Sequence, residues 1–107
     1  MRGDQTLLNK HMNNTEFLTQ LYYSVHALGL VKTQDDLSRL CGRAPAWFSS
    51  IKSRNIPMST SAAITLRLRV TDEMTSTIPR RLKPLAKQVT ASLDLFAQAR
   101  SLKKDWH

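Results

Sequence analysis

The chain has few of the residues on which disulfide-bonded, metal-binding and nucleotide-binding folds depend. Its 107 residues include a single cysteine, Cys41, and three histidines scattered along the sequence. One cysteine cannot form a disulfide within the chain, and the histidines lack the spacing of a metal site. Three glycines are too few for a glycine-rich phosphate loop. We therefore predict no metal, no cofactor, no small-molecule ligand and no enzymatic activity, with Cys41 as a buried structural thiol.

Long apolar runs are also missing. No stretch approaches the length that crosses a membrane, and the N-terminus has no apolar segment of the signal-peptide kind. The sequence therefore predicts a cytoplasmic protein without a membrane partner. Its length corresponds to one small domain.

Acidic residues are the other scarce class. Eight Asp and Glu stand against 16 Lys and Arg, which gives a formal net charge of +8. Most of the basic residues lie after residue 53. A small cationic protein attracts polyanions, with an affinity that falls as salt rises. The alternative is a well-solvated basic surface that binds nothing.

Apolar spacing predicts three helices in the first half of the chain, after a loose arm at residues 1–12. Asn14 or Thr15 can cap the start of the first, and Gly29 suits the residue just past its end. The second starts at Thr33 as N-cap, with two aspartates in its first turn, and ends at Gly42. The third runs over residues 45–54, from a proline suited to a first helical turn. The apolar side of the first helix contains Phe17, Leu18, Leu21, Val25 and Leu28.

Residues 59–70, "STSAAITLRLRV", fit two periods. Ala63, Leu66 and Val70 form a helical stripe, and one of the serines or threonines before them can cap a helix. Apolar residues also alternate with polar ones from Ile64 to Val70, which is the strand period. From the residues alone both assignments stay open. Residues 71–83, interrupted by Pro79 and followed by Pro84, are expected to form a connection.

Residues 84–107 are predicted to form a C-terminal helix with two apolar stripes. The first contains Leu85, Val89, Leu93 and Phe96, and the second contains Leu95, Ala99, Leu102 and Trp106. A surface helix needs only one stripe against its own core. We therefore expect this helix to form a homodimer, with an interface of Leu85, Val89, Leu93, Phe96, Leu102 and Trp106. The alternative is that one small core covers the helix, or that its end frays.

Residues 34–53 have the anatomy of a helix-turn-helix unit. Gly42 suits the tight turn, Ser38 is small enough for a close helix crossing, and apolar residues seal the crossing. The predicted motif core is Leu37, Ser38, Cys41, Gly42, Phe48 and Ile51. "TQDDLSRLCGRAPAWFSSIKS" resembles the helix-turn-helix of lambda-repressor-like (Cro/repressor type) DNA-binding domains. The resemblance covers roughly residues 15–70.

This resemblance implies an all-α fold, namely a compact helix-turn-helix domain at residues 13–70 of four short helices, followed by the longer C-terminal helix. It favours the helical assignment of residues 59–70. Two positions depart from the family. Arg43 stands where an apolar residue is usual, and Ala44 where a capping Ser or Thr is usual.

The resemblance also implies a double-stranded DNA partner, with helix 45–54 in the major groove. The face opposite Phe48 and Ile51 consists of small side chains, which permit close approach to base edges. We expect Arg43 to turn outward to DNA. The residues predicted to face bases are Arg43, Ala44, Pro45, Ala46, Ser49, Ser50 and Ser53. Those predicted to contact phosphates are Lys32, Thr33, Gln34, Lys52, Arg54 and Asn55.

Three functions fit these observations. The leading hypothesis is a dimeric transcriptional regulator of the repressor type, from a bacterium, phage or plasmid, located at the nucleoid. A ribbon-helix-helix DNA binder would instead pair strand 64–71 between two chains. A protein-interaction module would dock a partner through the C-terminal helix.

Overall fold

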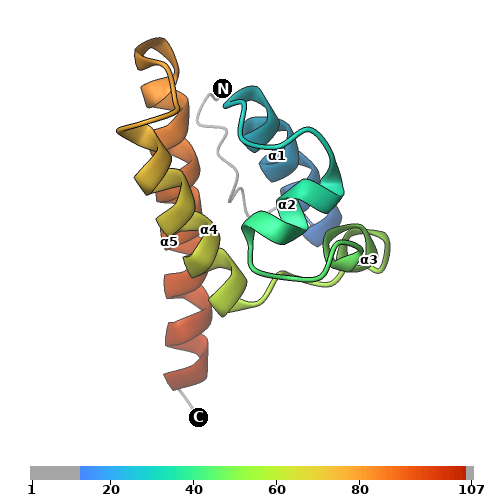
Figure 1. Cartoon of the computed structure of the whole chain (residues 1–107). Coiled ribbons are helices and arrows are strands. Elements are labelled where there is room, and N and C mark those ends of the chain that lie inside the picture. The colour runs from blue at the N-terminus through green and yellow to red at the C-terminus, as the bar shows by residue number, and fades with distance from the viewer. Residues whose placement is uncertain (1–12, 106–107) are drawn as a thin grey trace, which may run out of the picture.

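All regular elements of the described chain are helical. The computed structural model describes residues 13–105, and side chains as far as residue 99. The fold class expected from the sequence is confirmed, because four helices precede a longer C-terminal one (Figure 1). The elements are α1 (Asn14–Ala27), α2 (Gln34–Leu40), α3 (Trp47–Ser53), α4 (Thr60–Met74), the 3-10 turn η1 (Arg80–Leu82) and α5 (Lys83–Asp105).

The segment that fitted two periods is the helix α4. Ser59 caps it by accepting a hydrogen bond from the N–H of Ala62 at 3.2 Å. Leu66 and Val70 of the helical stripe are fully buried, whereas Ile64 and Leu68 are 43% and 53% exposed. Burial therefore follows the helical period. The prediction of a strand at 64–71, which the ribbon-helix-helix alternative requires, is wrong. The helix also continues to Met74, so the predicted connection at 71–83 is too long at its start.

The beginnings of α1 and α2 are set by capping boxes. The α1 cap is Asn13, one residue before the predicted candidates. Its side chain accepts from the N–H of Glu16 at 2.8 Å, and the Glu16 carboxylate accepts from the N–H of Asn13 at 3.0 Å. Thr33 caps α2 as predicted, in the same reciprocal arrangement with Asp36. Each box satisfies N–H groups that a helix start leaves without partners.

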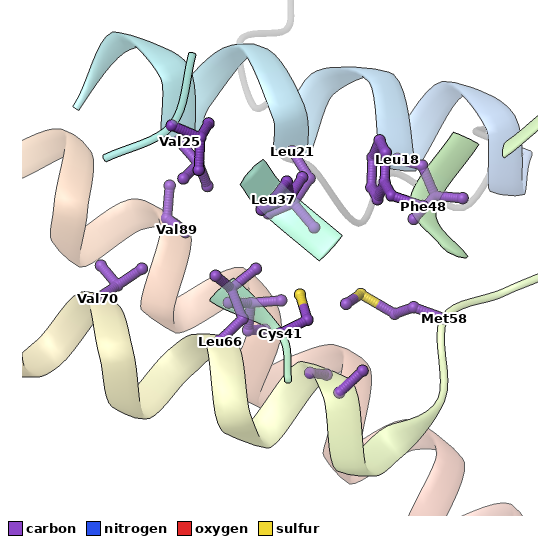
Figure 2. Packing of buried hydrophobic residues seen from close by; sticks show 14 of the residues in the cluster. Leu18, Leu21, Val25, Leu37, Cys41, Phe48, Met58, Leu66, Val70 and Val89 are labelled. Atoms are coloured by element: carbon purple, nitrogen blue, oxygen red, sulfur yellow. The ribbon is translucent and has the colours of Figure 1, made fainter. Parts of the chain in front are cut away.

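One hydrophobic core joins the helices. Leu18 and Leu21 of α1, Leu66 of α4 and Val89 of α5 point into the same space (Figure 2). Cys41 lies there as well, as predicted for a structural thiol, and burial raises its pKa to about 12. None of the helices within residues 13–105 is long and apolar enough to cross a membrane.

The first stripe of α5 belongs to this core. Val89 and Leu93 are fully buried, and Phe96 stacks on Phe17 of α1 with ring centroids 5.2 Å apart. Leu85 is partly buried against the same cluster. These four predicted interface residues therefore cover the chain's own core, and the buried ones cannot meet a second copy unless the fold opens. The side chains at 102 and 106, predicted for the same interface, lie outside the described part.

Candidate nucleic-acid interface

The turn between α2 and α3 has the backbone that the helix-turn-helix pattern requires. Gly42 has φ +77°, a left-handed conformation that glycine adopts without strain. Its N–H donates to the carbonyl of Arg39, and the N–H of Arg43 donates to that of Ser38, both at 2.9 Å. A Cβ at position 42 would meet only a methyl of Thr65 at 3.8 Å. Backbone conformation rather than lack of space therefore calls for glycine here.

Ser38 caps the start of α3 from the neighbouring helix. Its fully buried hydroxyl donates to the carbonyl of Gln34 at 3.3 Å and accepts from the N–H of Phe48 at 2.9 Å. Ala46, at the N-cap position of α3, makes no side-chain cap. The weak capping expected at Ala44 is thus compensated by a serine in α2. The other motif-core side chains, Leu37, Cys41, Phe48 and Ile51, are all buried.

Helix α3 is shorter than predicted at both ends. Pro45 and Ala46 form a turn closed by the hydrogen bond from the N–H of Trp47 to the carbonyl of Ala44 at 3.0 Å, and the helix runs only from Trp47 to Ser53. The predicted start at Pro45 is therefore wrong, because the cap that begins the helix acts at Phe48. Arg54, the predicted last residue, lies just beyond the end.

The outer side of this unit is built of small side chains. Ser49, Ser50 and Ser53 of α3 are exposed, as are Ala44, Pro45 and Ala46 of the preceding turn. Ser49 donates its hydroxyl to the carbonyl of Ala46 and Ser53 donates to that of Ser50. Their oxygens keep acceptor capacity toward an outside donor. We call these six residues the small-residue face.

Arg43 does not project freely from the turn. Its Nη2 donates to the hydroxyls of Ser59 and Ser61 at 2.7 and 2.8 Å, and its guanidinium carbon lies 5.6 Å from the ring centroid of Trp47. The guanidinium of Arg43 is therefore already bonded within the chain. Arg43 joins the turn to the start of α4 and packs on Trp47.

Asn55, predicted as a phosphate contact, joins α3 to the start of α1. It has φ +54°, and its side-chain oxygen accepts from the N–H of Thr15 at 2.9 Å and lies 3.1 Å from the Thr15 hydroxyl oxygen. Thr15 in turn donates its hydroxyl to the carbonyl of Lys52 at 2.8 Å. The sequence predicted only a phosphate contact at this position, although an asparagine directly after a helix is a known signal for a left-handed residue.

The predicted phosphate contacts at the start of α2 are partly engaged within the chain. The carboxylate of Asp36 accepts from the N–H groups of Lys32 and Thr33 at 3.0 and 3.2 Å, and pairs with Arg39 at 3.4 Å. These bonds, with that of Lys32 foremost, hold the pKa of Asp36 below its usual value. Two of the N–H groups at this end therefore already serve a carboxylate. The side chains of Lys32, which is exposed, and Gln34, which is half-buried, remain as candidate phosphate contacts.

Lys52 and Arg54 supply positive charge at the far end of α3. Lys52 is half-buried and Arg54 is exposed. With Arg43 beside Trp47 at the start of the helix, cations stand at both ends of the small-residue face.

No family model matches the chain, and neither a curated protein nor a solved structure is significantly similar to it.

Proposed function

We propose that the chain binds double-stranded DNA sequence-specifically, with α3 in the major groove. The observation that carries this proposal is the small-residue face with its cationic ends, presented by a helix held at both ends. Ser38 and Arg43 hold its beginning and Asn55 holds its end. A helix positioned in this way can approach base edges closely without losing much conformational freedom on binding.

Each part of this surface has a separate role in the proposal. The hydroxyls of Ser49, Ser50 and Ser53 meet base edges, and Ala44, Pro45 and Ala46 contact thymine methyl groups. Lys32, Gln34, Lys52 and Arg54 contact phosphates, which strengthens binding without selecting sequence. Arg43 stays between Trp47 and Ser61 and offers its remaining N–H groups to a phosphate beside the start of α3.

The biological role follows from the resemblance to lambda-repressor-like domains. It is that of a small transcriptional regulator of the repressor type, acting at the nucleoid in the cytoplasm of a bacterium or on phage or plasmid DNA. The net charge of +8 supports attraction to DNA along its length before a specific site is found.

An electrophoretic mobility shift with random duplex DNA at low salt tests the proposal first. We expect a shift at micromolar protein, as is usual for non-specific binding. Selection of bound sequences from random duplexes should then enrich a defined site. No shift at low salt, or selection without enrichment, would count against sequence-specific binding.

A pair of double variants locates the surface. Ser49→Glu with Ser50→Glu should abolish the shift while the helical circular dichroism is unchanged. Thr71→Glu with Ser76→Glu adds the same charge at exposed positions outside the small-residue face. We expect this control to lower the affinity for DNA only as far as two added negative charges weaken the salt-dependent attraction. Equal losses in both double variants would show that charge alone matters and that α3 is not the contact.

A further inference from the structure

A hollow of about 580 Å³ lies between the loop that joins α1 to α2 and the helices α2 and α4. Its lining consists of residues 29–32 of the loop, Asp36, Arg39 and Leu40 of α2, and Arg69 of α4. No residue of α3 lines it, so it is separate from the small-residue face. Its volume is in the range of small-molecule sites, which is roughly 300–1,000 Å³. We call it the α2–α4 hollow.

Cations outnumber carboxylates in the lining of this hollow. Lys32, Arg39 and Arg69 are positively charged, and Asp36 is the one acidic residue among them. The fold already occupies the Asp36 carboxylate. One of its oxygens accepts from the N–H groups of Lys32 and Thr33, and the other lies 3.4 Å from Nη1 of Arg39. Because a concave surface with an excess of one charge raises the local concentration of the opposite ions, the hollow favours an anion.

Arg39 and Arg69 have donors left for such an anion. Arg69 is exposed and makes no ion pair or hydrogen bond with another residue of the described part of the chain. Arg67, on the same helix, is by contrast paired with Asp94 at 2.7 Å. The bond from Arg39 to Asp36 uses one of the five N–H groups of a guanidinium. Two guanidinium groups from different helices can bind one phosphate or carboxylate group, each with paired N–H donors.

The wall formed by the α1–α2 loop is held in shape and offers an apolar surface. The hydroxyl of Tyr22 donates to the carbonyl of Lys32 at 3.1 Å, and the N–H of Leu30 donates to the carbonyl of Val25 at 3.4 Å. A wall fixed in this way loses little freedom on binding. Leu30 and Leu40 are only partly covered by the core. A molecule with an apolar body gains affinity by covering them, which an inorganic ion cannot do.

We propose that the α2–α4 hollow binds a small organic oxyanion. Arg39 and Arg69 donate to its phosphate or carboxylate group, and Lys32 adds a third positive charge. Its apolar body lies against Leu30 and Leu40. The sequence predicted no small-molecule ligand, because these cations belong to elements that are far apart in the chain. The proposal goes beyond the proposed function and does not rest on it, since binding is measured without DNA.

A titration of the ¹⁵N-labelled full chain followed by NMR, in roughly 0.15 M salt, tests the proposal. The probes are phenyl phosphate and phthalate, which share an aromatic body and differ in the oxyanion, and inorganic phosphate, which has no body. At least one organic probe should saturate with a Kd of about 1 mM or below. Its shifts should concentrate on the amide signals of residues 29–32, Arg39 and Arg69. Inorganic phosphate should bind about tenfold more weakly, because it leaves the two leucines uncovered.

Two double variants of equal charge locate the site. Arg39→Gln with Arg69→Gln should raise the Kd of the organic probe about tenfold or more, because both guanidinium groups are lost. Arg80→Gln with Arg81→Gln removes the same charge at exposed positions outside the lining. This control should change the Kd by less than about twofold, because salt screens distant exposed charges. Arg69→Gln alone, which breaks no bond within the described residues, should also weaken binding if the first pair loses helical content.

Four results would overturn the proposal. The first is the absence of saturable shifts with either organic probe up to about 10 mM. The second is shifts spread evenly over the basic residues rather than concentrated at the hollow. The third is equal weakening by the two double variants, which would assign binding to net charge. The fourth is inorganic phosphate that binds as tightly as the organic probes, which would mean that Leu30 and Leu40 receive no ligand.

Discussion

The hydroxyl of Ser38 accepts a hydrogen bond from the backbone N–H of Phe48 at 2.9 Å, across the junction of α2 and α3. The same hydroxyl donates to the carbonyl of Gln34, so its position is fixed by its own helix. The candidate DNA-contacting helix therefore begins where α2 places this oxygen. Ser38 is thus small enough for the helix crossing and also caps α3.

Ser38→Ala should destabilise the fold by about 1–2 kcal/mol, because it leaves the N–H of Phe48 buried without its partner. Urea unfolding followed by circular dichroism measures the loss. Ser53→Ala is the control, since its hydroxyl is exposed and bonds only within α3. It should change stability by less than about 0.5 kcal/mol. Equal stability of the two variants would mean that the Ser38 bond contributes nothing net.

Arg43 should resist replacement by lysine. A lysine cannot lie flat on Trp47 while bonding Ser59 and Ser61, so Arg43→Lys and Arg43→Ala should each lose about 1 kcal/mol of stability. Thermal or urea unfolding provides the measurement, with Arg54→Ala as an exposed control expected within about 0.5 kcal/mol of wild type. If the lysine variant matches wild type, positive charge rather than geometry is what position 43 supplies.

Asn55 combines a left-handed backbone with a cap on α1, and three substitutions separate these contributions. Asn55→Gly keeps the backbone but loses the bonds to Thr15, at a cost of about 1 kcal/mol. Asn55→Ala also adds backbone strain of about 1 kcal/mol. Asn55→Asp keeps an acceptor oxygen beside the start of α1 and should remain near wild type. The expected order of urea midpoints is therefore wild type and Asp, then Gly, then Ala. A glycine variant as stable as wild type would show that the cap on Thr15 is not needed.

Local signals in the sequence predicted much of this fold. Periodicity predicted the buried side of α1. Thr33, followed by two aspartates in the next turn, predicted the start of α2, and Asp36 completes the capping box there. Asn13 could have been found by the same rule, since Glu16 completes its capping box. The period-two alternation from Ile64 to Val70 does not correspond to a strand, because Ile64 and Leu68 of the helix α4 face outward.

What the sequence could not predict depends on partners distant along the chain. The start of α3 is set by Ser38, ten residues before Phe48, and the orientation of Arg43 by serines sixteen and eighteen residues away. Which stripe of α5 is buried depends on its packing against α4 and α1, including the stacking of Phe96 on Phe17. No local pattern contains that information, because both stripes have helical spacing. Local spacing therefore predicted the buried motif core, whereas it did not predict the bonds that Arg43 and Asn55 make within the chain.

Asp36 should make the stability of the fold sensitive to acid. Its pKa is lowered in the folded chain, first by the N–H of Lys32. A group with a depressed folded pKa stabilises the fold above its unfolded pKa, here an ordinary value of 3.8, and that contribution is lost as the pH falls through the lower folded value. Urea midpoints measured between about pH 6 and pH 2 should therefore fall less steeply for Asp36→Asn than for wild type, with Asp36→Asn already less stable at the neutral end. Asp35→Asn, in the same helical turn, is the control and should keep the acid-dependent loss. If Asp36→Asn falls as steeply as wild type, the acid sensitivity arises from other carboxylates and the capping box at Thr33 does not depend on ionised Asp36.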